Sequence, residues 1–224
     1  MEEIRLIEVK ENILSDNKAK ADELRDRLRS TGTFMLNLMS SPGSGKTSLI
    51  LRTIEALKDE FCLGVIEADI ESIVDSEKVA SRGVKVVQLR TGGFCHLDAA
   101  MVSEGLDVLG PQDLDLVIIE NVGNLVCPAE FDTGAIKNAM ILSIPEGDDK
   151  PLKYPLMFTV CDVLVVNKID AMAVFDFDIH AFKKRVRTLN QNINIFMTSC
   201  KTGEGINGWV NWIRNELKTF STLA

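Results

Sequence analysis

The stretch from Ser40 to Ser48, SSPGSGKTS, has glycine, lysine and hydroxyl residues at the spacing of a loop that binds phosphate groups. Gly43 and Gly45 allow backbone N–H groups to turn toward phosphate oxygens, and a helix N-terminus would add a favourable dipole. Lys46 would reach the β- and γ-phosphates of a nucleoside triphosphate, and the Thr47 hydroxyl would bind Mg²⁺. The predicted nucleotide contacts of this loop are Pro42, Gly43, Ser44, Gly45, Lys46, Thr47 and Ser48.

One position of this loop departs from the usual pattern, GxxxxGKS/T, which has glycine where this chain has Ser40. A serine fits there if its φ angle is negative. The alternative interpretation is a glycine-rich turn that binds nothing. Because Lys46 and Thr47 lie in register between an apolar run and an amphipathic stretch, we favour the phosphate loop.

Two later stretches predict that the nucleobase is guanine. In NKID, the carboxylate of Asp170 can accept hydrogen bonds from N1–H and the exocyclic amine of guanine, a donor pair that adenine lacks. The stem of Lys168 can lie along the base, and Asn167 can connect this loop to the phosphate loop. After the last apolar run, TSCKTGEG is expected to bring a backbone amide near the guanine oxygen, with contacts from Ser199, Cys200 and Lys201.

The stretch VIIENVG places Glu120 at the end of an apolar run and Gly123 three residues later. It looks like the DxxG switch of GTPases with glutamate in place of aspartate, so Glu120 would hold Mg²⁺ or its water and the Gly123 amide would sense the γ-phosphate. Asp69 and Asp75 are further candidates, for a Mg²⁺ contact and for orienting the attacking water, and Asp69 is the stronger metal candidate. Solvated loop acids are the competing interpretation. The predicted catalytic residues are Lys46, Asp69, Asp75 and Glu120, and the predicted Mg²⁺ ligands are Thr47, Asp69 and Glu120.

Three residues could bind a softer metal: Cys95 and His96, in TGGFCHLDA, and Cys127, in NLVCPAEF. They follow apolar runs whose ends should meet at the nucleotide edge of a parallel sheet. Two thiolates and one imidazole suit Zn²⁺ or Ni²⁺. Three ligands leave one coordination position open, which indicates either exchange of a carried metal or sharing between two chains. The alternative is that these cysteines are small core residues, as we expect for Cys62 and Cys161.

The overall composition limits the classes of partner. The 224 residues are 46% hydrophobic, enough for a substantial core, and the net charge of −8 argues against nucleic acid as the main partner. The acidic N-terminal stretch MEEIRLIEVKENIL is unlike a signal peptide, and no apolar run approaches the roughly 18 residues of a membrane span. Five cysteines, an odd number, favour reduced thiols. We therefore expect a soluble cytoplasmic protein that does not bind a membrane.

The elements that must position these residues alternate in the pattern of an α/β fold. Short apolar runs predict about seven strands of a mostly parallel sheet, and amphipathic stretches between them predict helices on both faces, the architecture of a P-loop NTPase. The predicted strands are Phe34–Met39, Cys62–Glu67, Val84–Leu89, Leu114–Glu120, Ala139–Ile144, Val163–Asn167 and Ile193–Thr198. The predicted helices are Thr47–Lys58, Ser72–Arg82, Asp98–Leu109, Asp178–Thr188 and Ile206–Leu217.

A charged N-terminal segment precedes the sheet. The stretch Ser15–Leu28 keeps Ala21, Leu24 and Leu28 at helical spacing, so we predict an N-terminal helix that packs on the domain. A solvated helical arm is the alternative. The predicted division is a helical extension over residues 1–30 and one P-loop GTPase domain over residues 31–224.

Five stretches, SSPGSGKT, TGGFCHLDA, IENVGNLVCPAEFD, PEGDDKPLKYP and NKID, occur in an order that resembles the hydrogenase nickel-incorporation GTPases, the HypB family of SIMIBI-class P-loop GTPases. The resemblance runs from about Phe34 to Cys200. It implies a GTPase metallochaperone that helps deliver nickel to the [NiFe]-hydrogenase large-subunit precursor. It also implies dimerisation with GTP bound, a small zinc-containing partner, HypA, and metal ligands at Cys95, His96 and Cys127.

The chain departs from some of these relatives at its N-terminus, because no cysteine precedes Cys62 and no histidine precedes His96. Any metal role is therefore expected at the internal site. The related urease nickel chaperones have Cys-Pro-His, whereas here Pro128 is followed by Ala129, which disfavours urease as the client. Two rival functions remain open: a P-loop kinase or other ATP-using enzyme with structural cysteines, and a metal-storage protein whose hydrolysis is incidental.

The nucleotide and metal candidates share one short segment, from Glu120 to Cys127. We therefore expect GTP and Mg²⁺ to order this segment and the segment from Asp69 to Asp75, so that metal affinity or dimerisation depends on the nucleotide. A tenfold change in metal affinity needs only about 1.4 kcal/mol of coupling. The sequence has no obvious arginine finger, which predicts slow intrinsic hydrolysis.

Overall fold

A seven-stranded sheet forms the centre of the protein. The computed structural model describes residues 9–69 and 74–222. All neighbouring strands pair in parallel, in the order β3-β2-β4-β1-β5-β6-β7. The strands are β1 (Phe34–Ser40), β2 (Leu63–Asp69), β3 (Lys85–Arg90), β4 (Leu116–Glu120), β5 (Lys137–Ser143), β6 (Val163–Asn167) and β7 (Asn194–Met197). The predicted fold class is confirmed, and each predicted strand matches an observed strand to within two residues at either end.

Helices surround the sheet, and the shorter ones were not predicted. The long helices are α1 (Val9–Thr31), α2 (Lys46–Leu57), α3 (Val74–Ala80), α4 (Ala99–Leu109), α8 (Ile179–Leu189) and α9 (Ile206–Ser221). The unpredicted turns are α5 (Cys127–Glu130), α6 (Lys150–Lys153), α7 (Pro155–Val160), η1 (Pro111–Asp113), η2 (Ile144–Glu146) and η3 (Ile169–Ala171). A helix of one or two turns is too short to display a helical apolar period, so sequence periodicity does not reveal it.

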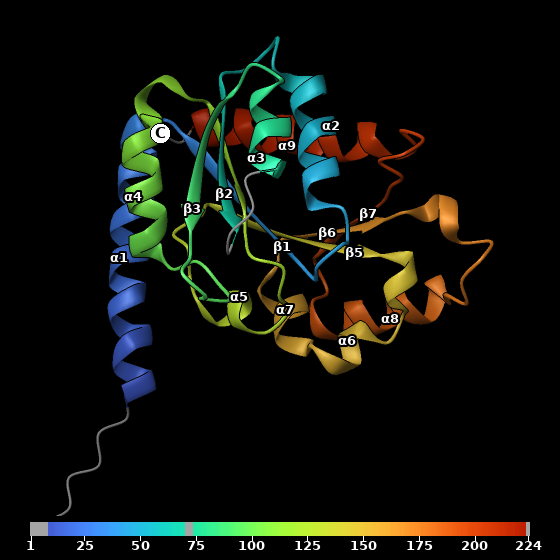
Figure 1. The fold of residues 1–224 in the computed structure, drawn as a ribbon. Helices are drawn as coiled ribbons and strands as arrows, with labels where there is room; N and C mark the ends of the chain where they lie inside the picture. Colours follow the sequence, from blue (N-terminus) through green and yellow to red (C-terminus); the bar gives the residue numbers. More distant parts are fainter. Residues whose placement is uncertain (1–8, 70–73, 223–224) are drawn as a thin grey trace, which may run out of the picture.

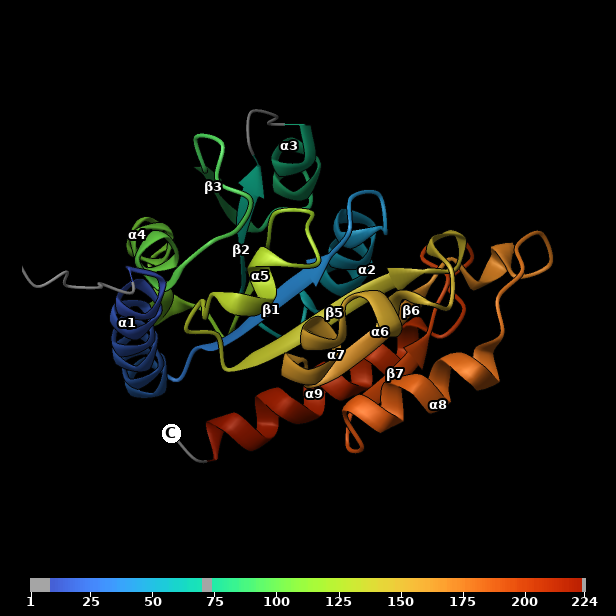
Figure 2. The ribbon, with the colours of Figure 1, turned by 90° about the horizontal axis from the view of Figure 1, so that it is seen from below.

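Apolar side chains on both faces of the sheet form the core. Along β1, Phe34 and Leu36 pack with α2, α3 and α9 on one face, while Met35 packs with α1 and α4 on the other. Further along the second face, α7 and α8 cover β5 and β6 (Figures 1 and 2). Because the central strands are buried on both sides, their sequences are continuous apolar runs rather than alternating ones.

The N-terminal helix α1 packs on the domain, as predicted. Ala21, Leu24 and Leu28 are buried, and α1 runs beside α4 (Figure 1). Asn17 adds a polar connection, because its Oδ1 accepts a hydrogen bond of 2.9 Å from the Ala99 backbone N–H, at the start of α4. The helix extends beyond the predicted range at both ends. A solvated arm is therefore excluded, while the division of the chain at residue 30 stays a prediction.

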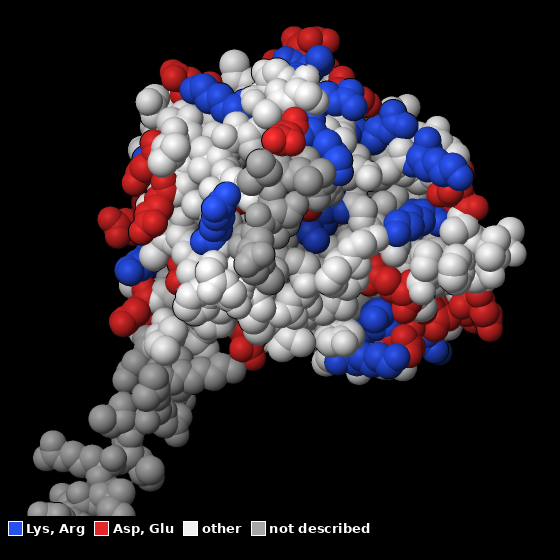
Figure 3. All heavy atoms as spheres, in the orientation of Figure 1, with Lys and Arg blue, Asp and Glu red and all other residues white. Residues whose placement is uncertain are grey.

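The surface carries charges of both signs. Figure 3 shows acidic and basic side chains interspersed over one face of the molecule. Within residues 9–69 and 74–222, no helix is long and apolar enough to cross a membrane.

The carboxyl ends of the central strands meet at one edge, where α/β sheets bind ligands. Glu120 at the end of β4 is in register with Leu38 of β1 and with Glu67 of β2. On the other side of β1, Asn167 at the end of β6 is in register with Ser143 of β5. The sheet therefore brings the ends of five strands together.

Candidate functional site

The phosphate loop joins β1 to α2. Gly45, with φ of 104°, precedes the first residue of α2, Lys46. Ser40 has the negative φ angle that a serine needs at this position of the loop, because Lys168 is the single non-glycine residue with positive φ among the described residues. The buried Oγ of Ser40 accepts hydrogen bonds from Ser44 Oγ at 2.6 Å and from Lys46 Nζ at 3.1 Å. The serine at the departing position thus contacts the loop's lysine directly.

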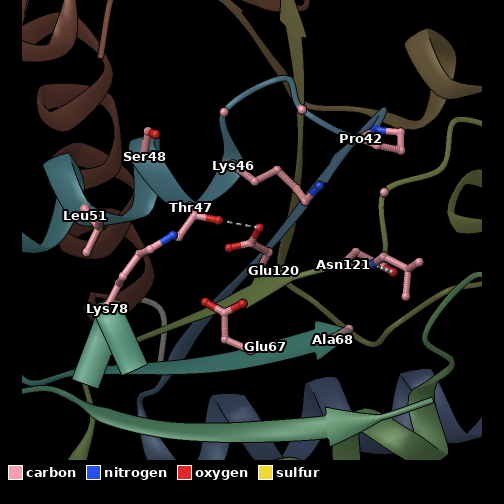
Figure 4. A pocket seen from close by; sticks show the side chains of 14 residues that line it. Pro42, Lys46, Thr47, Ser48, Leu51, Glu67, Ala68, Lys78, Glu120 and Asn121 are labelled. Atoms are coloured by element: carbon pink, nitrogen blue, oxygen red, sulfur yellow. Dashed lines mark hydrogen bonds between the residues drawn. The ribbon is translucent and has the colours of Figure 1, made fainter. Parts of the chain in front are cut away.

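A cavity of about 570 Å³ lies next to this loop. Thr47 Oγ1 donates a 3.0 Å hydrogen bond to Glu120 Oε1 (Figure 4). The carboxylate of Glu67 points toward the same space, below Thr47. One hydroxyl and two carboxylates are the hard oxygen donors that suit Mg²⁺ beside a nucleotide phosphate. The cavity is lined by Pro42, Gly43, Gly45, Lys46, Thr47, Ser48, Leu51, Glu67, Ala68, Lys78, Glu120, Asn121, Val122 and Gly123.

Sequence reasoning missed Glu67, although a signal was present. Glu67 is the last residue of the predicted strand Cys62–Glu67, as Glu120 is of its strand, and a charged residue that ends a buried run is a candidate ligand. Both carboxylate side chains are buried. The predicted roles of Asp69 and Asp75 fall outside the part of the chain whose side chains the structure describes.

The predicted switch segment contacts the phosphate loop at a glycine. A Cβ atom added at Gly123 would lie 3.1 Å from Pro42 Cα, closer than side chains normally approach a backbone. The segment after β4 therefore lies directly against the loop that would hold the phosphates, and a larger residue at position 123 would separate them.

A second cavity, of about 310 Å³, lies on the other side of the phosphate loop. Asn167 Nδ2 donates to the Ser44 carbonyl at 3.0 Å, and Lys168 Nζ donates to the Gly43 carbonyl at 2.6 Å. Lys168 has φ of 61°, a left-handed conformation that is uncommon outside functional sites and turns. The cavity is lined by Gly45, Ser48, Asn167, Lys168, Asp170, Ala171, Cys200 and Lys201.

The two predicted base-recognition loops meet at this cavity. Ser199 Oγ donates a 2.6 Å hydrogen bond to Asp170 Oδ1, and Lys201 Nζ lies 4.0 Å from Asp170 Oδ2. The backbone N–H of Cys200 donates to Asn167 Oδ1 at 3.2 Å. Burial raises the pKa of the Cys200 thiol to about 11, so this thiol is protonated at neutral pH. The carboxylate of Asp170 and the neighbouring backbone amides are groups that can form hydrogen bonds with a purine base.

Three potential metal ligands lie together at the same edge of the sheet. The ligand atoms of Cys95, His96 and Cys127 are within 4.8 Å of one another. The Cys95 thiol donates to Cys127 Sγ at 2.9 Å, and Cys95 Sγ lies 3.9 Å from His96 Nδ1. The imidazole of His96 stacks on Phe131 with ring centroids 3.8 Å apart. This arrangement fits a thiophilic ion such as Ni²⁺ or Zn²⁺.

The ionisation of these ligands is perturbed. Burial lowers the pKa of His96, which keeps the imidazole neutral and able to ligate at neutral pH. Pairing with Cys95 raises the pKa of Cys127, because the two sulfurs share a hydrogen bond that holds the proton on Cys127 and because a second thiolate beside a first one is unfavourable. Cys127 begins α5, and Pro128 follows it in the first turn of that short helix.

The prediction for Cys62 was wrong, whereas that for Cys161 is confirmed. Cys161 is buried in the core between α7 and β6. Cys62 is exposed and lies one residue before β2, at the amino edge of the sheet. Its backbone is still anchored, since the Cys62 N–H donates to Asp115 Oδ2 at 2.7 Å.

Comparison with known proteins places the chain in a family. Residues 34–197 match the family model described as CobW/HypB/UreG, nucleotide-binding domain. The hydrogenase maturation factor HypB of Azotobacter vinelandii is 45% identical over 215 residues, which cover 96% of this chain and 71% of that protein. The chain belongs to the HypB family. The Helicobacter hepaticus relative, named hydrogenase/urease maturation factor HypB, is 45% identical over 89% of this chain and 84% of its own length.

A solved HypB structure agrees with the fold. The crystal structure of HypB from Helicobacter pylori in complex with nickel superposes with a TM-score of 0.86 at 38% identity and covers 91% of this chain and 96% of that chain. Nickel is therefore a ligand of that HypB protein. In this chain, the three residues that the HypB resemblance implies as metal ligands, Cys95, His96 and Cys127, form one cluster.

Proposed function

We propose that this protein is a GTP-hydrolysing metallochaperone that binds nickel and assists its insertion into [NiFe]-hydrogenase. The observation that carries the proposal is the segment from Glu120 to Cys127. It begins in the nucleotide cavity, where Glu120 accepts a hydrogen bond from Thr47, and ends in the thiol and imidazole cluster, seven residues later. One segment thus belongs both to the cavity beside the phosphate loop and to the candidate metal cluster.

Lys46, Thr47 and Glu120 support the GTPase part of the proposal. In this proposal the loop amides and Lys46 bind the phosphates, Thr47, Glu120 and Asp69 hold Mg²⁺, and Asp75 orients the attacking water. Mg²⁺, when bound, would neutralise charge on the β- and γ-phosphates. Asp170 would recognise guanine, supported by its hydrogen bond from Ser199. Because the sequence has no obvious arginine finger, we expect hydrolysis to be slow.

The soft ligand set supports nickel as the cargo. Two thiols and a neutral imidazole bind Ni²⁺ and Zn²⁺ alike, so cellular supply and client decide between them. Three protein ligands leave a position for a fourth donor, from solvent, a second chain or the next carrier. An ion that one more ligand can reach is suited to transfer rather than to permanent storage.

We further propose that the protein works in the cytoplasm as a homodimer with GTP bound, together with a HypA-like accessory protein and the hydrogenase large-subunit precursor. Exposed apolar side chains support an association surface, because large apolar groups outside the core often mark protein contacts. Five of these side chains lie in α6, α7 and the segment after η3: Leu152, Leu156, Met172, Val174 and Phe175.

Urease maturation is the second candidate function, and one observation favours it: the Helicobacter hepaticus relative is named a hydrogenase/urease maturation factor. Against it stands Ala129, where urease chaperones have histidine after the proline. Complementation separates the two, because a hydrogenase chaperone restores hydrogenase activity in a maturation-deficient host without restoring urease activity.

The decisive experiment is a Ni²⁺ titration with GDP and with a non-hydrolysable GTP analogue, followed by thiolate-to-nickel charge-transfer absorbance. We expect one Ni²⁺ per chain, an affinity that differs between nucleotides, and loss of binding in Cys127→Ala but not in the matched control Cys62→Ala. A preference for ATP would favour the kinase alternative, and a ratio well above one Ni²⁺ per chain would favour storage. Unchanged binding in Cys127→Ala would refute the metal site.

A further inference from the structure

A buried asparagine connects the nucleotide cavity to the metal cluster. Asn121 follows Glu120 at the end of β4, is fully buried and lines the cavity beside the phosphate loop (Figure 4). Its Oδ1 accepts two backbone hydrogen bonds, from Val122 N–H at 2.9 Å and from Leu97 N–H at 3.2 Å. Leu97 is the residue after His96. One carbonyl oxygen therefore holds both the switch segment and the loop that carries two metal ligands.

The orientation of Asn121 is determined by its own hydrogen bonds, one of which is the first in a row of amides across the sheet. Asn121 Nδ2 donates to Asn37 Oδ1 of β1 at 3.1 Å, and Asn37 Nδ2 donates to Asn138 Oδ1 of β5 at 3.0 Å. A buried amide without partners is unfavourable, so the three hydrogen bonds of the Asn121 side chain, to Val122, Leu97 and Asn37, give it one preferred rotamer. The side chain is anchored at the rigid centre of the sheet while its oxygen reaches both loops.

Asn124 makes a second connection between the same two loops. Its Nδ2 donates to the Cys95 carbonyl at 3.4 Å, and its Oδ1 accepts from the Val126 N–H at 2.9 Å. Val126 precedes Cys127. Asn124 therefore contacts the backbone of Cys95 and the backbone of Val126, the residue before Cys127.

From these contacts we propose that Asn121, supported by Asn124, is the positioning residue that transmits the nucleotide state to the metal ligands. The inference rests on the proposed nucleotide-dependent metallochaperone function. When the Glu120–Gly123 segment moves against the γ-phosphate, the Val122 N–H is displaced. This N–H and the Leu97 N–H both donate to Asn121 Oδ1, so the displacement reaches the loop that carries Cys95 and His96. Metal sites tolerate changes of only about 0.2 Å in ligand distance, so a small shift of the Cys95–His96 loop changes the affinity.

The test measures coupling rather than affinity. Ni²⁺ dissociation constants are determined with GDP and with a non-hydrolysable GTP analogue, and their ratio is compared among wild type, Asn121→Ala and Asn138→Ala. Coupled sites typically show ratios of roughly 5- to 150-fold. We expect the ratio to approach one in Asn121→Ala and to persist in Asn138→Ala, the matched control that disturbs the same amide row without touching either loop. The reciprocal measurement, analogue affinity with and without Ni²⁺, must give the same factor.

The outcomes separate this inference from the function on which it rests. A wild-type ratio of one removes the nucleotide switch itself, and the inference with it. A wild-type ratio above one that persists in Asn121→Ala, or that is lost equally in Asn138→Ala, overturns the role of Asn121 alone. Should Asn121→Ala unfold in a thermal melt, Asn124→Ala at its less buried position decides: a reduced ratio supports the proposal, and an unchanged ratio overturns it.

Discussion

The Sγ atoms of Cys95 and Cys127 lie 2.9 Å apart, although the two residues follow strands that are not neighbours in the sheet. Cys95 follows β3 and Cys127 follows β4, with β2 between them. The loops therefore converge over the end of β2, the strand that supplies Glu67 to the cavity beside the phosphate loop. An ion bound by both sulfurs would connect two loops that otherwise meet through asparagine side chains and stacked rings.

Nickel affinity should increase with pH. The lowered pKa of His96 means that this ligand is already neutral at pH 7, whereas the raised pKa of Cys127 means that its thiol must lose a proton when metal binds. We expect the association constant to rise about tenfold per pH unit for each thiol proton displaced, between about pH 6.5 and 8.5. Calorimetric titration in buffers of different ionisation enthalpy counts the protons. A flat profile would show that the thiols do not ligate.

Asp170→Asn should weaken binding of GDP. The substitution removes a carboxylate acceptor and leaves the guanine donors facing an amide, and a hydrogen bond to a charged group contributes about 1.5–3 kcal/mol. We expect GDP affinity to fall by about 10-fold or more, with a gain for xanthosine diphosphate, whose 2-oxo group can accept from the new amide. Asp176→Asn, an exposed carboxylate nearby, is the control. Equal loss in both variants would contradict base recognition by Asp170.

The three thiols outside the metal cluster should differ in reactivity. Cys62 is exposed, burial raises the pKa of Cys161 strongly, and burial raises the pKa of Cys200 to about 11. Because the thiolate is the reactive form, only about 0.1% of Cys200 is reactive at pH 8. We expect iodoacetamide to label Cys62 first and Cys200 slowly, with faster labelling of Cys200 as pH increases. Peptide mass spectrometry over a time course measures the order, and early labelling of Cys161 would contradict its burial.

The N-terminal helix should contribute to stability. Leu28 is fully buried against the domain, and truncating such a side chain costs about 2–5 kcal/mol. Ile13 lies on the same helix but is 51% exposed, so Ile13→Ala should change the free energy of unfolding by less than about 0.5 kcal/mol. Urea denaturation of both variants tests the difference. Similar effects of Leu28→Ala and Ile13→Ala would indicate that the helix is not part of the cooperative unit.

Local pattern was sufficient for the strands, the longer helices and the phosphate loop. Gly43 and Gly45 followed by Lys46 and Thr47 indicate a strand-to-helix turn without further information. The turn needs Gly45 in a left-handed conformation, and the helix begins at the next residue. The buried runs were recognisable for the same reason, because burial on both faces demands uninterrupted apolar residues. The short helices α5 to α7 have no such local signal.

What the sequence by itself determined was therefore which residues form strands and which loops carry donors, because these depend on side chains close together in the chain. Only the tertiary structure decided which loops meet. The order β3-β2-β4 brings Cys95 to Cys127 and pairs Glu67 with Glu120, and the apolar pattern is the same for any strand order. Cys62 shows the converse, since its apolar neighbours suggested burial but it is exposed just before β2, whereas Cys161, just before β6, is covered by α7. Strand order and edges arise from packing between distant segments, which local periodicity does not encode.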